Sequence, residues 1–560
     1  MEYQHLTTPA IHFGFFGRLI VVAFCGFVSL DAYTQIVDDA DGLLQSRLQA
    51  HVEFLADDLL RGRQTGSDGH NIAAAYVASQ FLQLGLRPAG DNGGFFQQVP
   101  LRSAILVPGS AKMTIAYGGS ETKLVFVDEF FMRPDLGRKQ SELTAGMVFV
   151  GYGIDAPVLD YNDFEGLDVD GKVVVSLTGQ PENFPSEEGA HFASSTEKAR
   201  AAARHGAVGL ITIFTPRATD LYPWERRKSS LGMPSMGWLN KEQQPNATIE
   251  QLRAEVEINH AAAAVLFEGT GVELSALLEK DLKGVPLNGF KLNGTVALRQ
   301  QSEHETISSP NVVAVLPGSD PLLRDEYVVY IAHLDHIGEL RADRANPQAD
   351  LINNGALDNA SGVSVMIETA RLLARGKPPR RSILFVAVTA EEKGLVGSEY
   401  FATNPTVPVA SMVAAINLDM PVLLYEFADV IAFGAEHSSL GLSVRQAADS
   451  YGVRLTPDPF PDENIFVRSD HYRFVQQGIP SVYLVTGVSA LDGSTDKQAV
   501  LEAYLADHYH KPGDDLNLPI HYGAAARFTR INVKIGEIIA NEATRPVWHE
   551  GDFFGRTFAK

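Results

Sequence analysis

Hydrophobic residues near the start of the chain recur at helical spacing. Five of them follow one another at intervals of three or four residues: Leu44, Leu48, Val52, Leu55 and Leu59. This pattern predicts a helix that begins at about Asp41. The glycine-rich segment 61–69 interrupts it, and a second helical pattern over residues 72–81 ends at Gly85. The sequence therefore predicts two helices joined by a turn.

The pattern changes from about residue 101 to residue 300. Short runs rich in β-branched residues, at 147–150, 172–175 and 209–213, alternate with glycine, proline and aspartate clusters. Such runs are typical of strands. One helical pattern precedes the third run, over residues 197–205, and ends at Gly206. We expect a small β-rich region here.

From about residue 311 onward, apolar runs alternate with longer helical patterns. The runs occupy residues 312–315, 327–332, 382–388 and 414–417. Continuous apolar runs are typical of strands that are buried on both faces by flanking helices. We therefore predict an α/β fold with a mixed, mostly parallel central sheet flanked by helices.

Charge and cysteine content narrow the possible chemistry of this chain of 560 residues. Its formal net charge is −22, and an acidic protein repels phosphate backbones, so we expect no nucleic-acid partner. The single cysteine, Cys25, excludes a disulfide framework within the chain and a cysteine-rich zinc site. Any metal must be held by histidine, aspartate and glutamate.

The N-terminal segment resembles an export signal. Arg18 precedes the apolar run 19–30, which is shorter than the roughly 20 residues that span a bilayer. We expect residues 1–34 to be a signal peptide, with Ala32 near a poorly defined cleavage site. A buried strand or an N-terminal anchor is the alternative. No second apolar run reaches membrane length, so the mature protein is expected to be periplasmic or secreted, without a stable membrane span.

Polar side chains cluster where the predicted strands end. One strand runs into the segment 333–336, His-Leu-Asp-His, another into the segment 389–392, and a third into 418–420. Two further polar segments are 355–362, Gly-Ala-Leu-Asp-Asn-Ala-Ser-Gly, and 508–515. In open α/β sheets, ligands bind beyond the carboxyl ends of the strands. Each segment alone has an ordinary structural explanation, such as a helix cap, but their combination predicts one site.

These residue types suit a pair of metal ions. Two histidines and three carboxylates, without thiolates, are appropriate ligands for ions that prefer nitrogen and oxygen. One carboxylate can bridge two ions, and a spare glutamate beside a ligand can act as a general base. Asp335 lies two residues after His333 and can return to orient that imidazole.

The motifs resemble peptidase family 28 of the metallopeptidases, the co-catalytic di-zinc aminopeptidases and their relatives. The matching segments are 333–335, 355–362, 391–398, 417–420, 469–474 and 509–510. Together they extend from about residue 308 to residue 540. The fold that the resemblance implies is that of the zinc exopeptidases, a phosphorylase/hydrolase-like fold.

The resemblance also implies individual roles. One Zn²⁺ would be held by His333 and Asp419, a second by Glu392 and His510, and Asp358 would bridge both. Glu391 would be the general base, Asp335 the partner of His333, and Tyr509 a group that stabilises the oxyanion. The expected cofactor is therefore two Zn²⁺ per chain.

The middle of the chain resembles a protease-associated (PA) domain, a small β-rich insertion whose role in such enzymes is substrate access or partner contact. Its motifs are the segments 149–153, 168–175 and 198–210. The expected domains are a signal peptide (1–34), an N-terminal helical part of the peptidase domain (35–130), the PA insertion (131–300), the catalytic domain (301–545) and a C-terminal tail (546–560).

The resemblance implies a zinc-dependent exopeptidase, with aminopeptidase action on peptide substrates as the first choice. Carboxypeptidase or dipeptidase action is an alternative that needs basic groups facing the site, for which Arg468 and Arg473 are candidates. A glutaminyl cyclase uses one zinc ion, and the presence of both His333 and Asp419 favours the hydrolase. A receptor-like binding protein that has lost metal ligands is a further alternative, although here every expected ligand is present.

Overall fold

The computed structural model describes residues 30–559 except 230, 247, 341–347 and 492–496. The expected signal peptide lies largely outside these residues, since its positions 1–29 are not described. Among the helices that are described, none combines the length and the apolar character that crossing a bilayer requires.

The central sheet is mixed, with parallel strands at its centre. Its strands are β2 (Phe96–Leu106), β11 (Ser235–Trp238), β13 (Phe290–Leu316), β14 (Tyr327–His333), β17 (Ser382–Val388), β18 (Met412–Asn417), β19 (Asp429–Phe433), β20 (Arg454–Thr456) and β21 (Ser481–Thr486). They lie in the order β11–β2–β13–β17–β14–β18–β21–β19–β20, and the short β1 (Arg87–Pro88) pairs with β13. The pairs β17–β14, β14–β18, β18–β21 and β19–β20 are parallel. The predicted fold class and all four predicted strands are confirmed.

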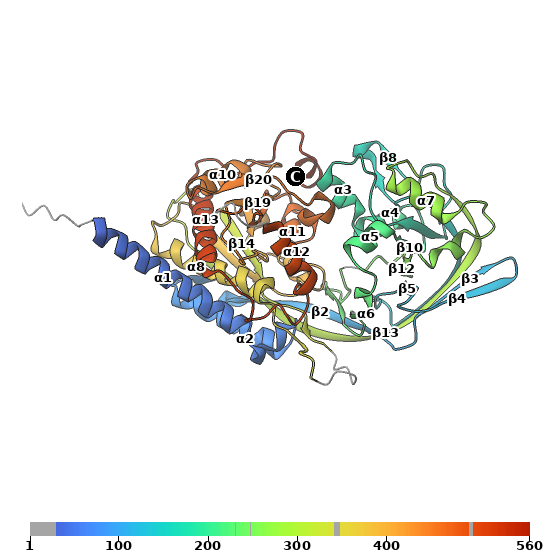
Figure 1. Ribbon diagram of the computed structural model, residues 1–560, viewed down its shortest axis with the longest axis horizontal. Helices are drawn as coiled ribbons and strands as arrows, with labels where there is room; N and C mark the ends of the chain where they lie inside the picture. Colours follow the sequence, from blue (N-terminus) through green and yellow to red (C-terminus); the bar gives the residue numbers. More distant parts are fainter. Residues whose placement is uncertain (1–29, 230, 247, 341–347, 492–496, 560) are drawn as a thin grey trace, which may run out of the picture. The chain divides into compact units, whose positions relative to one another are not determined.

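Helices cover both faces of this sheet. They are α8 (Gly362–Arg375), α9 (Val396–Thr403), α10 (Leu440–Asp449), α11 (His471–Val475) and α13 (Tyr522–Asn541). Strand residues alternate between two cores: Val328 and Tyr330 face one core together with α8 and α13, whereas Val329 and Ile331 face the other. Figure 1 shows α8 and α13 beside β14. This alternation explains why the strands read as continuous apolar runs.

The two N-terminal helices are α1 (Leu30–Leu55) and α2 (Asp68–Gln83). Four of the five residues in the first pattern, Leu44 to Leu55, are at most 1% exposed, and from Leu44 on they pack into the core that α8 and α13 share. The assignment of Leu59 to this helix is wrong. Leu59 is 84% exposed and lies in the 3₁₀ helix η1 (Asp58–Arg63), because the capping carboxylate of Asp57 starts a new turn there.

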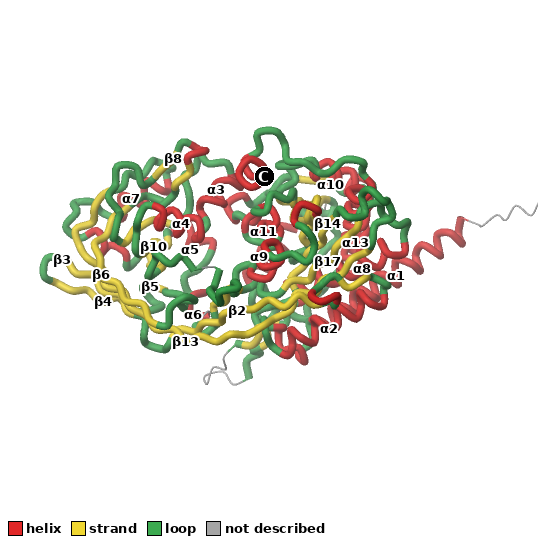
Figure 2. The backbone as a smooth tube through the Cα atoms, turned by 180° about the vertical axis from the view of Figure 1, so that it is seen from behind, coloured by secondary structure: helices red, strands yellow, loops and turns green. Residues whose placement is uncertain are grey.

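A second sheet contains most of the β-rich region. Its strands are β3 (Lys112–Tyr117), β4 (Ser120–Leu124), β5 (Phe130–Phe131), β6 (Gln140–Phe149), β9 (Val173–Leu177), β10 (Gly209–Phe214) and β12 (Glu255–Asn259). The order β5–β12–β10–β9–β6–β13–β3–β4 includes the N-terminal half of β13. Figure 2 shows β13 as one long strand that belongs to both sheets. The expected boundary between residues 300 and 301 therefore falls inside a continuous strand.

Smaller elements complete this part of the chain. They are α3 (Ser186–Ala193), α4 (Ser195–Arg204), α5 (Pro216–Leu221), α6 (Arg226–Ser229), α7 (Leu274–Leu282), and the hairpin β7 (Asp155–Ala156) with β8 (Tyr161–Asn162). The predicted helix before Gly206 is α4. The remaining elements are the hairpin β15 (Gly338–Glu339) with β16 (Ile352–Asn353), and the helices α12 (Lys497–Asp507) and α14 (Phe553–Phe558).

Candidate metal centre

Three neighbouring parallel strands bring polar residues to one edge of the central sheet. His333 is the last residue of β14. Glu391 and Glu392 follow the end of β17, and Asp419 follows the end of β18. Parallel strands end at the same edge, so these side chains converge. Asp358, in the turn η5 (Ala356–Ser361) before α8, and His510, after α12, join them from distant parts of the chain.

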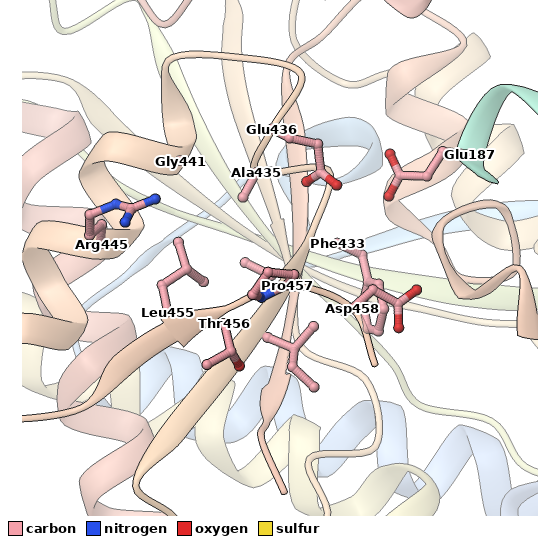
Figure 3. A pocket seen from close by; sticks show the side chains of 12 residues that line it. Glu187, Phe433, Ala435, Glu436, Gly441, Arg445, Leu455, Thr456, Pro457 and Asp458 are labelled. Atoms are coloured by element: carbon pink, nitrogen blue, oxygen red, sulfur yellow. The ribbon is translucent and has the colours of Figure 1, made fainter. Parts of the chain in front are cut away.

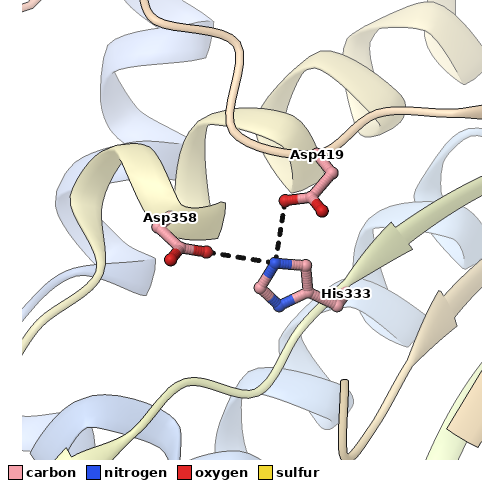
Figure 4. Close-up of side chains that lie close together, drawn as sticks. All are labelled: His333, Asp358 and Asp419. Carbon is pink, nitrogen blue, oxygen red and sulfur yellow. Dashed lines mark hydrogen bonds and ion pairs between the residues drawn. The ribbon is translucent and has the colours of Figure 1, made fainter. Parts of the chain in front are cut away.

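The first group of side chains consists of His333, Asp358 and Asp419 (Figure 4). His333 Nε2 lies 3.1 Å from Asp358 Oδ1 and 3.0 Å from Asp419 Oδ1. All three residues are buried. Their ligand atoms point toward one another rather than toward the protein around them, as they must in order to share an ion.

The second group uses the other oxygen of Asp358. His510 Nε2 lies 3.2 Å from Asp358 Oδ2 and 3.4 Å from Glu392 Oε2. His336 Nδ1 lies 2.7 Å from Glu392 Oε1. Asp358 thus presents one carboxylate oxygen to each group, which is the arrangement expected of a bridging carboxylate.

The structure differs from the expectation for Asp335. His333 Nδ1 lies 3.1 Å from the main-chain carbonyl oxygen of Asp335, not from its carboxylate. That carboxylate instead accepts hydrogen bonds from the amide of Glu391 and from the hydroxyl of Thr65. The carbonyl satisfies Nδ1 and leaves Nε2 free for a ligand, while the carboxylate fixes the main chain beside the expected general base.

Arg63, in the segment that joins α1 and α2, stabilises the main chain around the centre. The guanidinium of the buried Arg63 donates hydrogen bonds to the main-chain oxygens of Leu334, Asn354 and Gly355. These residues flank His333, His336 and the turn that carries Asp358. The sequence predicts a turn here but not this bracing contact.

Three described residues with strained backbone lie at or beside the expected ligands. Ala390, Met420 and His510 have φ values of 55°, 43° and 58°, in the left-handed region that non-glycine residues rarely adopt. Each is a ligand residue or adjoins a site residue. Strain of this kind, about 1–3 kcal/mol per residue, persists where function constrains the backbone.

The opposite charges in the two groups of donors shift one another's pKa values strongly. Burial alone would lower the pKa of His333, but the charges of Asp419 and Glu391 outweigh it and raise that pKa well above its usual range. Burial alone would raise the pKa of Asp358, but the histidines around it lower that pKa well below its usual range. Burial raises the pKa of Glu391 well above its usual range, opposed by His333 and reinforced by Glu392. Such a concentration of carboxylates favours a bound cation.

The donor atoms fit zinc. Imidazole nitrogen and carboxylate oxygen are ligands that zinc accepts. Both ring nitrogens of His336 and Oε1 of Glu392 are buried and have no hydrogen-bond partner among the described residues, although buried polar atoms normally have one. A metal ion would satisfy atoms that the protein leaves unpaired.

Tyr509 lies beside the second group. Its ring centroid is 3.8 Å from that of His510. Burial raises the pKa of Tyr509 well above its usual range, and the charge of Asp358 acts in the same direction. The phenol therefore stays protonated at neutral pH and can donate a hydrogen bond.

The two candidate arginines differ in their surroundings. Arg473 donates a hydrogen bond to the main-chain oxygen of Gly394 and lies 3.9 Å from Glu399. Arg468 contacts Glu463 and the hydroxyl of Tyr222, from the β-rich region. Its positive charge also acts on the pKa of Tyr509. Arg468 is therefore placed to influence the centre.

Sequence reasoning missed two residues that contact the centre. His336 lies in the segment 333–336, but the sequence pattern assigns it no role. Asp514 accepts hydrogen bonds from the amides of Leu357 and Asp358, at 2.9 and 3.0 Å, and thereby fixes the bridging residue. Its position four residues after His510 is the sequence feature that indicates a place near the centre.

A cavity of about 190 Å³ lies apart from these residues, between α3 and the region of β19, β20 and α10 (Figure 3). Three acidic residues, Glu187, Glu436 and Asp458, are among its lining residues. No lining residue belongs to the metal centre, so the cavity does not form part of the candidate site.

Comparison with known proteins supports the resemblance over the C-terminal part. Residues 311–535 match the family model described as Peptidase family M28. A protein named "Probable zinc metalloprotease" from Pyrenophora teres f. teres (strain 0-1) is 37% identical over 131 residues, which are 22% of this chain and 26% of that protein. "Aminopeptidase YwaD" from Bacillus subtilis (strain 168) is 27% identical over 260 residues, or 44% and 50% of the two chains. The matched part of the chain thus spans half or less of the length of these relatives.

The fold has a counterpart among solved structures. The aminopeptidase from Aneurinibacillus sp. strain AM-1 is similar with a TM-score of 0.51 at 21% identity, covering 90% of this chain and 97% of that one. At this level of sequence identity, the comparison supports a similar fold and nothing further.

Proposed function

We propose that this protein is a zinc-dependent aminopeptidase that hydrolyses N-terminal residues from peptides. The observation that carries the proposal is Asp358, whose two carboxylate oxygens face two separate groups of donors. His333 and Asp419 would complete one zinc site, and Glu392 and His510 the other. The match of residues 311–535 to Peptidase family M28 supports the same chemistry.

Bound zinc would lower the pKa of a water molecule and polarise the scissile carbonyl. The residues of the chain perform the proton transfers. Glu391 accepts the proton of the attacking water and delivers it to the nitrogen of the leaving amine. Asp335 keeps Glu391 in place through its hydrogen bond to the Glu391 amide. Tyr509 donates a hydrogen bond to the developing oxyanion.

Aminopeptidase action follows from the charge of the site. The buried carboxylates around Glu391 include Asp419 and Asp470, both of which act on its pKa. A carboxylate-rich pocket binds the ammonium of a free N-terminus better than a C-terminal carboxylate. The positive charge of Arg468 is already paired with Glu463.

A panel of substrates tests the proposal. We expect aminoacyl-nitroanilides with a free amino group to be hydrolysed, their N-acetylated counterparts to be inert, and a chelator to abolish activity that zinc restores. Hydrolysis of N-blocked dipeptides from the C-terminus would instead identify a carboxypeptidase. Zinc content of zero together with no hydrolysis would identify a receptor-like binding protein.

We further propose that residues 131–300 are a PA domain inserted between residues 35–130 and the catalytic residues 301–545, with 546–560 as a tail. The second sheet has its own hydrophobic core, which supports a separate domain in this part of the chain. That core also includes Ala111, Met113, Ile115 and Phe130, so the second sheet begins before residue 131. The contact of Tyr222 with Arg468 supports a role in substrate access.

We also propose export to the periplasm or the medium, with removal of residues 1–34. The apolar run after Arg18 supports this. Mass spectrometry of the exported protein is expected to find a new N-terminus near Ala32. Retention of residues 1–34 in a cytoplasmic protein would contradict export.

A further inference from the structure

His336 is a buried histidine for which the expected pair of zinc sites has no role. It follows Asp335 in the loop after β14 and is 0% exposed. Its ring lies beside the second group of donors, with its centroid 6.0 Å from that of His510. A histidine in such a position requires partners for its ring nitrogens, because an unpaired buried polar atom destabilises the folded protein.

The residues that the structure describes supply no hydrogen-bond partner for either ring nitrogen. Glu392 Oε1 likewise makes no hydrogen bond within the described part of the chain, although it lies only 2.7 Å from His336 Nδ1. The two atoms are therefore close without the alignment of a hydrogen bond. Nδ1 also lies 3.9 Å from Asp358 Oδ2. One ligand atom each from His336, Asp358 and Glu392 falls within 4.8 Å of the others, as expected for donors around one ion.

Gly355 leaves space for the imidazole ring of His336. Gly355 has a φ of +63°, and a Cβ there would come within 2.7 Å of two ring atoms of His336 and 2.2 Å of the main-chain oxygen of Asp358. A side chain at residue 355 would therefore displace His336 and the bridging residue together.

We infer that His336 is a further ligand of the zinc ion at Glu392 and His510, through Nδ1. This inference rests on the proposed function, since it concerns an ion of the same centre. The second position then has four protein donors, namely Asp358, Glu392, His510 and His336. The first has only three: His333, Asp358 and Asp419.

The unequal donor numbers give the two ions different roles. Four protein ligands are typical of closed, structural zinc sites, whereas three ligands and an open position are typical of catalytic ones. The ion at His336 is therefore the tighter one and holds Asp358 and Glu392 in place. The ion at His333 would be the more weakly held, because it has one protein donor fewer.

Zinc titration of the full protein tests this assignment without any activity measurement. The metal-free protein is loaded with one equivalent of zinc, and X-ray absorption spectroscopy counts the imidazole nitrogens around it. We expect two, from His336 and His510. A count of one would overturn the inference, and it needs no variant that might fail to fold. If the protein binds no zinc at all, the proposed function fails with it.

Variants provide a second readout through competition with a chromophoric chelator. His336→Ala is expected to weaken the tighter ion by more than about 100-fold, because loss of a residue that only orients a ligand costs about 10–100-fold. His191→Ala removes another buried histidine, which contacts Tyr472 away from the centre, and is expected to leave zinc affinity unchanged. If zinc affinity fell by less than about 100-fold in His336→Ala while both variants remained folded, the ligand role of His336 would be overturned.

Discussion

At the scale of single residues, the centre depends on side chains that hold the main chain around its ligands. Asn359 shows this directly. Its side-chain oxygen accepts hydrogen bonds from the amides of Gly362 and Met420, and its amide group donates to the oxygen of Leu418. It thus connects the turn of Asp358 with the loop of Asp419. These contacts explain how two segments far apart in sequence keep their donors within reach of one ion.

Asp514 makes a prediction at this scale. Asp514→Ala leaves the buried amides of Leu357 and Asp358 without acceptors, which should cost about 2–6 kcal/mol of unfolding free energy. Because Asp514 positions the bridging carboxylate, zinc affinity should fall by about 10–100-fold. Urea denaturation and zinc competition measure the two effects. Asp515→Ala, which removes a neighbouring carboxylate that faces Asn517, is the control, and equal effects of both variants would contradict the role of Asp514.

At the scale of elements, the helices and strands follow from local patterns, while the connections between them do not. The strand runs at 327–332, 382–388 and 414–417 predicted the edge at which the donors meet, because parallel strands end together. The bracing by Arg63 was not predictable, since a glycine-rich turn has no periodicity that shows where its side chains point. Likewise, the Asp335 carboxylate accepts a hydrogen bond from the amide of Glu391, which lies 56 residues further along the chain. The residue types indicated a metal site, but they did not indicate which atoms of these residues contact one another.

Arg381 connects two of these elements. It is 0% exposed, pairs with Glu326 at 2.7 Å, and donates hydrogen bonds to the oxygens of Ile539 and Glu542 at the end of α13. Arg381→Ala should lower the free energy of unfolding by about 3 kcal/mol. Arg381→Lys should lose less, because it keeps the charge but not the fork of donors. Denaturation curves compare the two variants. If they were equally stable, these hydrogen bonds would not hold α13 in place.

At the scale of the whole molecule, a histidine links three distant segments. The ring of His437, which precedes α10, contacts Glu187 in α3 and lies 2.5 Å from Asp552 at the start of α14. Burial opposes the charged ring, but the two carboxylates outweigh burial and raise the pKa of His437 to about 9. Burial also raises the pKa of Glu187, to about 7. The negative charges of Glu436 and Glu188 act on Glu187 as well.

This link predicts a pH dependence of stability. Because the folded pKa of His437 is above its ordinary value of 6.5, its contribution is complete below about pH 6.5 and is lost as the pH rises through about 9. The loss should approach about 3 kcal/mol. The raised pKa of Glu187 acts in the same direction. His437→Gln should remove most of the slope between pH 6.5 and 9 in urea denaturation. A slope that persists in this variant would assign the effect to other groups.

The proposed role of Glu391 as the general base of a zinc peptidase can be tested in one comparison. Glu391→Gln is purified beside the unaltered protein, and zinc content and hydrolysis of an aminoacyl-nitroanilide are measured on the same samples. We predict equal zinc content and a decrease in turnover of about 10²–10⁴-fold, whereas Asp358→Ala should lose zinc. Near-full hydrolysis by Glu391→Gln would show that Glu391 is not the general base.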